Sequence, residues 1–224
     1  DGEAMSAAAV EPEKLSHVDL YGIGTNLTCF SFIQADEDKM ECLAEMRRKV
    51  ENAAGHTLEI VSGGNSAALD LMMRGGICEG VDNFRLGESL LFGKERSRYT
   101  FLPGTRNDGF ILECEVVEAK VKPSLPWGTA GVDSYGRKPV FTDRGEKRKK
   151  VICAIGRQDF DAETATPVDE GILILGASSD HLMLDVTDSV KEYKVGDIVE
   201  LRLGYFSVLR AFTSPYVEKI FLKK

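Results

Sequence analysis

The sequence has no apolar run that approaches the roughly 20 residues needed to span a membrane. Its first residues also lack the basic segment followed by an apolar one that marks a secretory signal. These two absences predict a cytoplasmic protein that has no membrane partner.

Patterns of metal ligands are equally scarce. The sequence has three histidines, no HExxH motif and no two cysteines close enough to form a CxxC pair. We therefore expect no metal site. The cysteines are odd in number and most lie in apolar runs, which predicts buried, reduced thiols in a cytoplasmic protein. They are Cys29, Cys42, Cys78, Cys114 and Cys153.

Basic residues are fewer than acidic ones. The sequence has 28 lysines and arginines and 36 acidic residues, which gives a net charge of −8. A protein that binds nucleic acid usually carries a basic patch. The only strong basic run covers residues 144–150 and precedes an apolar stretch, so we interpret it as a solvated hairpin turn. We expect no nucleic-acid partner.

The first part of the chain alternates short apolar strands with helices. Met40, Leu43, Met46 and Val50 recur every three or four residues, which predicts a helix over 37–53. Strands alternating with helices predict a parallel sheet. The expected strands are 18–23, 58–61 and 81–86, and the other expected helices are 66–74 and 88–92.

The character of the sequence changes after Gly93, where short strands separated by Gly, Pro and Asp turns predict a β-barrel or sandwich. The fold class is therefore α/β plus all-β. We place the boundary in the polar stretch 94–109 and expect domains at 1–93 and 94–224. The strands expected in the second domain are 110–121, 151–155, 171–176, 181–186 and 196–203.

Three βα units do not make a closed architecture, because a parallel sheet is normally covered on both faces and its edges are liabilities. We therefore expect these units to be the last βα units of a larger (β/α)8 TIM-type barrel. The other strands would come from residues before Asp1 or from a second chain. The start without methionine fits a cut end.

Two consecutive strand–helix junctions carry glycine and small polar residues, at 62–66 (SGGNS) and 85–89 (RLGES). Backbone N–H groups at such junctions favour anions, and the loops after the last two strands of (β/α)8 barrels often bind phosphate. We expect Ser66 to offer its hydroxyl, and Gly64, Gly87 and Glu88 their amides. The alternative is an ordinary connection capped by Asn65 or Ser66.

Several long stretches resemble one family. NSAA followed by FRLGESLLFG resembles the phosphate-binding segment of alanine-racemase-like, fold type III pyridoxal-phosphate enzymes, and GASSDHLMLDVTDS with KVGDIVEL resembles their C-terminal β-domain. The similarity is greatest to the ornithine-racemase branch, and the stretches that carry it are GIGTNLTCF, EIVSGGNSAALDLM, GRQD and RAFTSPYVEK. The resemblance covers residues 18–222.

The resemblance implies that pyridoxal 5'-phosphate is the cofactor and that Arg85 faces its pyridine nitrogen. Ser66 matches a phosphate ligand, while Asn65 more simply braces the turn. The family holds its cofactor as a Schiff base on a lysine near the first barrel strand, and no residue here matches that lysine. Lys120 and Lys122 are poor substitutes, because they lie in the β-rich part.

The family also uses a tyrosine of the β-domain as the second acid/base group, donated across a dimer. Tyr135 is the candidate for it, although residues 127–129 compete for the same place and an exposed turn tyrosine is an equal alternative. Asp180 matches an aspartate near the active site, or it is a turn residue before the strand that begins at His181. His181 itself is expected to be structural.

The resemblance implies a pyridoxal-phosphate amino-acid racemase, an isomerase acting on ornithine or a similar small amino acid. This chain would supply the phosphate and pyridine contacts and the β-domain. Its partners would be a barrel segment carrying the lysine, from the same protein or a separate chain, and a second copy, giving a homodimer or a dimer of heterodimers. The alternative is a non-catalytic or regulatory subunit that keeps the racemase fold without the lysine.

Overall fold

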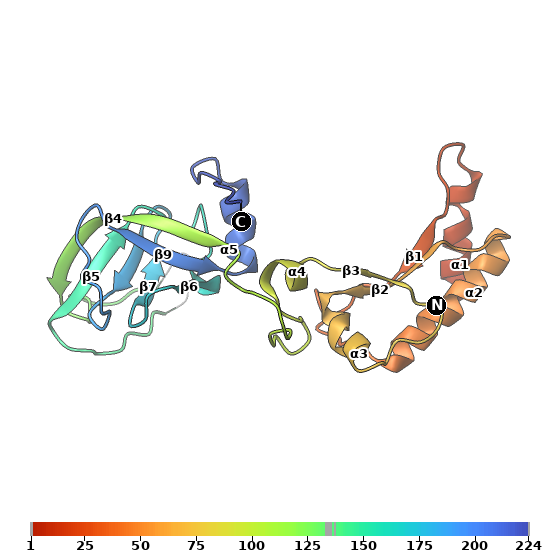
Figure 1. The fold of residues 1–224 in the computed structure, drawn as a ribbon, viewed down its shortest axis with the longest axis horizontal. Helices are drawn as coiled ribbons and strands as arrows, with labels where there is room; N and C mark the ends of the chain where they lie inside the picture. Colours follow the sequence, from red (N-terminus) through yellow and green to blue (C-terminus); the bar gives the residue numbers. More distant parts are fainter. Residues whose placement is uncertain (1, 133–135, 137, 224) are drawn as a thin grey trace. The chain divides into compact units, whose positions relative to one another are not determined.

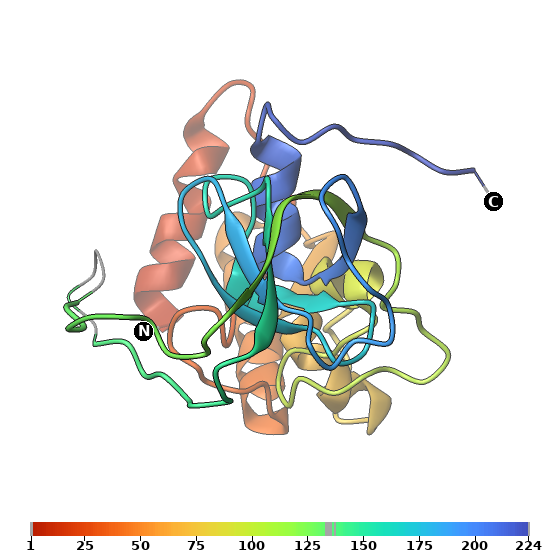
Figure 2. The same ribbon diagram turned by 90° about the vertical axis from the view of Figure 1, so that its left-hand side faces the viewer.

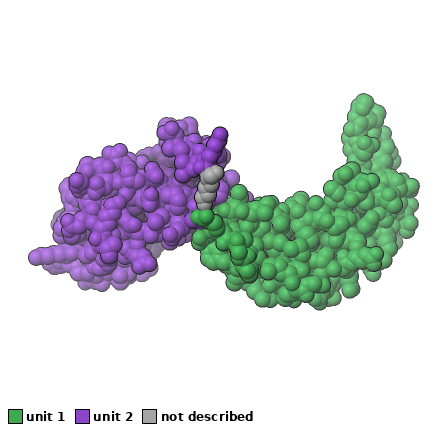
Figure 3. Space-filling model, viewed as in Figure 1, with its two compact units in different colours: residues 1–107 green, residues 108–224 purple. Residues whose placement is uncertain are grey.

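The computed structural model describes residues 2–132, 136 and 138–223 of the chain. It divides into two compact units, Asp1–Asn107 and Asp108–Lys224 (Figure 3). The division lies inside the polar stretch 94–109, and residues 94–107 are grouped with the first unit. Each unit has its own sheet and its own core of buried apolar side chains.

The first unit is a three-stranded sheet, ordered β1-β2-β3, with helices in the connections (Figure 1). Both strand pairs are parallel, as the alternation of strands and helices predicted. Its elements are α1 (Gly2–Val10), a 3-10 helix (Pro12–Lys14), β1 (Gly22–Gly24), α2 (Glu37–Ala54), β2 (Ile60–Asn65), a 3-10 helix (Ser66–Ala68), α3 (Leu69–Met73), β3 (Asn83–Arg85) and α4 (Glu88–Phe92).

Strand β2 is longer than the sequence predicted at its carboxyl end. The residues interpreted as a turn after the strand, Ser62 to Asn65, are themselves extended and pair with both neighbours. Gly24 lies beside Ser62, and Asn65 lies beside Arg85 across a register shift. The polar residues therefore continue the sheet rather than leave it.

Helix α2 begins and ends where its sequence provides caps. The Asp36 carboxylate accepts a hydrogen bond from the Lys39 amide at 3.0 Å, and Gly55 ends the helix with a φ of 79°. The predicted periodicity is confirmed, because Met40, Leu43 and Val50 are the buried residues of the helix. Helix α1, which the sequence did not predict, packs against α2 (Figure 1).

The second unit is a six-stranded antiparallel sheet, ordered β6-β9-β4-β5-β8-β7, that curls around its core (Figure 2). Strand β6 and helix α5 were not predicted. Its elements are β4 (Ile111–Lys122), β5 (Arg148–Cys153), a 3-10 helix (Ala162–Thr164), β6 (Ala165–Pro167), β7 (Leu173–Ala177), β8 (Leu182–Asp185), β9 (Ile198–Leu203) and α5 (Tyr205–Thr213).

The core of the second unit follows from alternation along its strands. In β4, Leu112, Cys114 and Val116 are buried while the residues between them are exposed. Phe160 lies in the loop after β5 and has no exposed area. Among the residues that the structure describes, it has the largest fully buried side chain. The outer strands β6 and β7 leave a hollow of about 460 Å³ between them.

The basic run at 144–150 is not only a solvated turn, as the sequence suggested. Its last residues open strand β5, where Arg148 donates to the Asp185 carboxylate at 2.8 Å and to Asp188 at 2.6 Å. Asp185 is almost fully buried. Burial opposes its ionisation, but the hydrogen bonds from Arg148 and Thr187 prevail and hold the pKa of Asp185 below its usual value.

The prediction that most cysteines are buried is wrong. Cys29 and Cys42 are exposed and Cys78 is half-buried, so only Cys114 and Cys153 in the second unit are buried. The apolar runs around the other three lie in loops or on the outer face of α2. Among the helices of the described part, none is long and apolar enough to cross a membrane.

Replacing Phe160 by Ala should destabilise the second unit by about 3–5 kcal/mol, because a large cavity opens in its core. Hydrogen exchange of the Val151 and Leu184 amides should then be faster by about 100-fold or more. Phe221→Ala is the matched control, since that ring is 79% exposed. Equal exchange in the two variants would contradict the proposed core.

Candidate functional site

The two glycine-bearing junctions lie side by side, as expected from consecutive parallel strands. The Ser66 and Ser89 hydroxyls are 3.0 Å apart, and the Ser89 amide donates to the Ser66 oxygen at 3.2 Å. Both serines are buried. We call the pair of junctions, residues 62–66 and 85–89, the anion turn.

The backbone of the anion turn is open where the glycines lie. Gly64 has a φ of 122°, which L side chains rarely adopt, and a Cβ there would have no atom closer than 3.9 Å. A Cβ on Gly87 would meet nothing within 4 Å. These glycines therefore leave room for a group to approach the main chain.

Asn65 braces the anion turn from within. Its side-chain oxygen accepts from the Ala67 amide at 2.8 Å, so it caps the short helix that follows β2. Its amide group donates to the Asn26 side chain at 2.7 Å and to the Leu27 carbonyl at 3.2 Å. The side chain therefore ties the turn to the loop after β1.

Arg85 joins the ends of all three strands. Its guanidinium donates to the Ser62 hydroxyl and, at 2.7 Å, to the Thr25 carbonyl. The Thr25 amide in turn donates to the Ser62 carbonyl at 2.9 Å. The guanidinium is thus held across the carboxyl edge of the sheet with its charge unpaired by any carboxylate among the described contacts.

Glu88 and Arg96 form an ion pair at 3.5 Å beside the anion turn. The Arg96 amide also donates to the Ser66 carbonyl at 3.3 Å, so the segment after α4 contacts both junctions. Glu88, expected to offer only its amide, thus also contributes a side chain that is 11% exposed.

The segment after α4 is organised by Glu95, which sequence reasoning missed. The Glu95 carboxylate is buried and accepts from the Ser97 amide at 2.8 Å, the Arg98 amide at 2.8 Å and the Thr100 amide at 3.2 Å. The Ser97 and Thr100 hydroxyls donate to it as well. The only sequence signal was a glutamate followed by small polar residues. We call residues 94–101 the Glu95 loop.

In the second unit, Asp180 lies in an exposed turn before β8. The Ser178 amide donates to the His181 carbonyl at 2.8 Å, and the Ser179 hydroxyl donates to the Asp180 carboxylate at 3.0 Å. This agrees with the alternative that Asp180 is a turn residue, and it also leaves the carboxylate at the surface. His181 is exposed, and the hydrogen bonds described for it involve its backbone.

The GRQD segment, residues 156–159, supports the Asp180 turn. The Arg157 amide donates to the Ser178 carbonyl at 2.8 Å, and the Gln158 amide donates to the Ser179 carbonyl at 3.1 Å. The contact depends on Gly156, because a Cβ there would lie 2.2 Å from the Ser179 carbonyl oxygen.

Helix α5 and the chain after it hold the same segment from the other side. The buried Asp159 carboxylate accepts from the Ser214 hydroxyl at 2.6 Å. The Arg210 guanidinium donates to the Arg157 carbonyl at 3.2 Å. Asp159 is a further buried carboxylate that the sequence analysis did not single out.

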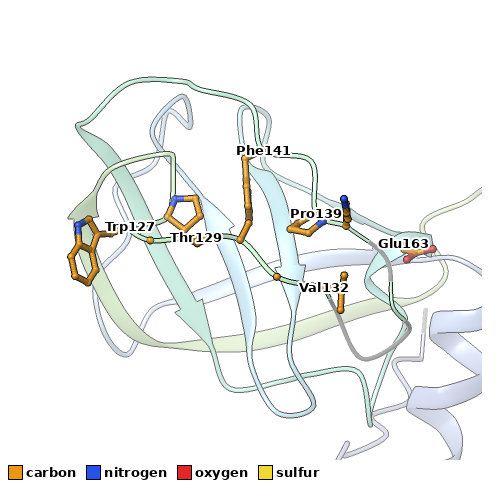
Figure 4. A pocket seen from close by; sticks show the side chains of 11 residues that line it. Trp127, Thr129, Val132, Pro139, Phe141 and Glu163 are labelled. Carbon is orange, nitrogen blue, oxygen red and sulfur yellow. The ribbon is translucent and has the colours of Figure 1, made fainter.

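Tyr135 lies outside the described residues. The segments on either side of it line an open hollow of about 600 Å³ (Figure 4). Trp127 and Glu163 lie at opposite ends of this hollow, and Phe141 lies between them. Lys120 and Lys122 both pair with Glu118 on β4.

The anion turn thus combines Asn65, Ser66, Arg85, Gly87 and Glu88 with Gly64 in the first unit, while Asp180 belongs to the second. Its hydroxyls, open glycine backbone and fixed guanidinium suit a phosphorylated, anionic ligand. Pyridoxal 5'-phosphate fits this donor set, because the carboxylate within the anion turn, Glu88, is paired with Arg96. Across the part of the chain that the structure describes, no cluster of side chains suits a metal ion.

The chain is similar in sequence to curated amino-acid racemases. It is 46% identical over 219 residues to the ornithine racemase of Acetoanaerobium sticklandii and 41% identical over 221 residues to the lysine racemase of Thermotoga maritima. These matches cover 98% and 99% of the chain but 62% of each relative, so the chain spans less than two thirds of their length. No protein-family model matches the sequence.

Among solved structures, the fold is similar to alanine racemases. The enzyme from Clostridium difficile 630, in complex with cycloserine, matches 95% of this chain and 56% of its own at a TM-score of 0.53 and 20% identity. The Bartonella henselae enzyme with covalently bound pyridoxal phosphate matches 89% of this chain and 52% of its own at 0.54 and 20%. The fold expected from the resemblance is therefore confirmed.

The Glu95 loop should loosen in acid. Burial raises the pKa of Glu95, but hydrogen bonds from Ser97, Thr100 and Arg98 outweigh it, so the folded pKa lies below the usual value. Its stabilisation is therefore present above the unfolded pKa of about 4.3 and is lost as the pH falls through the folded pKa. NMR should show the Ser97, Arg98 and Thr100 amides titrating together below pH 4.3.

Glu95→Gln should abolish this common titration, because it removes the carboxylate that these amides share, while the amides of the second unit should stay unchanged. A common titration at or above pH 4.3, or one that survives in the variant, would show that Glu95 does not organise the loop.

Proposed function

We propose that this chain, a relative of the ornithine and lysine racemases with the fold of the C-terminal part of alanine racemases, is part of a pyridoxal-phosphate-dependent amino-acid racemase. Similarity over nearly the whole chain supports this proposal. The observation that carries it is the meeting of the two junctions in the anion turn, with Ser66 and Ser89 in contact.

The residues that would hold the cofactor phosphate are Ser66, through its hydroxyl, and Gly64, Gly87 and Glu88, through their amides. Ser66 is already oriented by the Ser89 amide, so little side-chain freedom remains to be lost on binding. Asn65 keeps the turn in place from the loop side.

Arg85 would face the pyridine nitrogen. Its guanidinium is fixed by Ser62 and by the Thr25 carbonyl, so a permanent positive charge occupies the edge of the sheet. A fixed cation disfavours a second positive charge next to it, and the pyridine nitrogen would therefore stay unprotonated. Held in this position, Arg85 would limit how strongly the bound ring withdraws electrons.

When bound, the cofactor supplies stabilisation of the carbanion that forms at the substrate Cα. Racemisation also needs one group that removes the Cα proton on one face and another that returns it on the opposite face. Tyr135 is the proposed group from this chain, and a lysine outside these 224 residues is the other. Asp180 would act near the reacting atoms from its exposed turn.

The proposed substrate is ornithine, since the ornithine racemase is the relative with the higher identity of the two. Lysine, which also carries a side-chain amine, is the substrate named for the other. We further propose that other strands complete a (β/α)8 barrel around β1, β2 and β3, that two such assemblies pair, and that the protein is cytoplasmic.

Racemisation of L-ornithine by the full-length protein, followed by chiral chromatography, tests the proposal. D-ornithine should accumulate to an equal mixture and do so only with cofactor present. Firm binding of the cofactor without racemisation of ornithine or lysine would favour the alternative, a non-catalytic subunit that keeps the racemase fold.

Borohydride reduction of the full-length holoprotein should label a lysine outside residues 1–224 of this chain. Within the chain, Lys94 is the lysine of the Glu95 loop, but its ammonium lies 4.3 Å from the centre of the Tyr99 ring and is held there as a cation. Peptide mapping by mass spectrometry decides. A label on Lys94, or on any other lysine of this chain, would refute the proposal that the cofactor lysine lies outside residues 1–224.

Ser66→Ala should weaken cofactor binding by about 1.5–3 kcal/mol, because a charge-assisted hydrogen bond to the phosphate is lost. The dissociation constant of the cofactor, measured by fluorescence titration of the full-length apoprotein, should rise about 10-fold or more. Ser124→Ala, in an exposed loop of the second unit, is the matched control. Equal affinities would remove Ser66 from the phosphate site.

A further inference from the structure

The Glu95 loop contains a buried carboxylate that the proposed reaction does not use. The contacts described for Glu95 come from amides and hydroxyls of Ser97, Arg98 and Thr100, all within five residues. Its own amide donates to the Thr100 carbonyl at 3.0 Å. A buried charge must be satisfied by such donors, so the carboxylate dictates one conformation of the loop.

That conformation includes a strained residue. Tyr99 has a φ of 60°, which is uncommon for a residue other than glycine and marks a position that its surroundings impose. The Lys94 ammonium lies 4.3 Å from the centre of the Tyr99 ring, and the Arg96 guanidinium carbon lies 5.7 Å from it. The ring is therefore held by two cations of the same loop.

The loop directs the Arg96 side chain at Glu88. The Arg96 guanidinium pairs with the Glu88 carboxylate at 3.5 Å, and its carbon lies 5.7 Å from the centre of the Tyr99 ring. Burial and then the charge of Glu88 raise the pKa of Tyr99 above its usual value, so the hydroxyl keeps its proton.

Arg96 links the two halves of the anion turn from outside. Its amide donates to the Ser66 carbonyl at 3.3 Å while its guanidinium holds Glu88, which belongs to the other junction. A loop that fixes Arg96 therefore fixes the spacing between Ser66 and the Gly87–Glu88 backbone. That spacing must match the oxygens of a single phosphate group.

We propose that Glu95 is a positioning residue for phosphate binding, acting through Arg96, which holds Glu88 and thereby the second junction of the anion turn against Ser66. The proposal rests on the proposed function, because it assumes that the anion turn binds the cofactor phosphate. It adds two residues, Glu95 and Arg96, that would never touch the phosphate yet set how tightly it is bound.

The substitution that tests Glu95 best is Glu95→Gln. It keeps the size of the side chain but replaces one acceptor oxygen by an amino group, which would face donors such as the Ser97 amide and hydroxyl or the Arg98 amide. The loop must then open to relieve the clash of donors. Arg96→Gln is the second variant, because it removes the guanidinium that pairs with Glu88.

The experiment compares binding of pyridoxal 5'-phosphate and of pyridoxal, which lacks the phosphate, to the full-length apoprotein. Glu95→Gln should weaken binding of the phosphorylated compound about 10-fold or more, and Arg96→Gln about 3-fold or more, since each disturbs contacts with a charged group. Pyridoxal binding should change less than about 2-fold. Glu170→Gln, an exposed glutamate of the second unit, is the control.

Equal losses for both compounds would show a general structural role and overturn the proposal, as would unchanged binding of the phosphorylated compound. If Glu95→Gln fails to fold, Arg96→Gln decides by the same comparison. Ser66→Ala separates the two hypotheses. If it also leaves the phosphate preference intact, the proposed function fails; if it alone reduces the preference, only the role of Glu95 fails.

Discussion

Strand β2 hydrogen-bonds to both β1 and β3 in parallel, and the candidate site depends on this pairing. Parallel neighbours end at the same edge of a sheet, so whatever follows each strand is gathered at one place. Arg85 can reach Thr25 only because β2 lies between them as a spacer of one strand. The contact between Ser66 and Ser89 has the same origin.

The two units satisfy buried carboxylates in different ways. Glu95 is surrounded by local amides and hydroxyls, whereas Asp185 is neutralised by Arg148 from the neighbouring strand β5. Local donors fix the shape of a loop, while a cross-strand ion pair fixes the register of two strands. The first arrangement suits a loop that shapes a binding site, and the second suits a sheet that supports such a site.

Much of the fold could be predicted from sequence, because helix α2 and most strands of the second unit have clear periodicity or dense β-forming residues. Helix α5 was missed because its apolar residues, Tyr205, Phe206 and Leu209 among them, directly follow a strand and resemble its continuation. Residues 62–65 were expected to leave the sheet as a turn, but they are extended, because neighbouring strands that local sequence does not reveal impose this conformation. The Glu95 loop has no periodic pattern in its sequence, because its conformation is fixed by hydrogen bonds to a single carboxylate.

Gly156 allows the GRQD segment to pack directly on the turn that contains Asp180, so the two loops cannot move independently. Without a side chain at that position, the GRQD segment lies directly on the backbone of Ser179, and both are anchored to α5 through Arg157 and Arg210. An insertion or a bulky replacement in either loop must therefore displace the other. Sequence variation at this end of the second unit would therefore have to occur in side chains, with the course of the main chain kept constant.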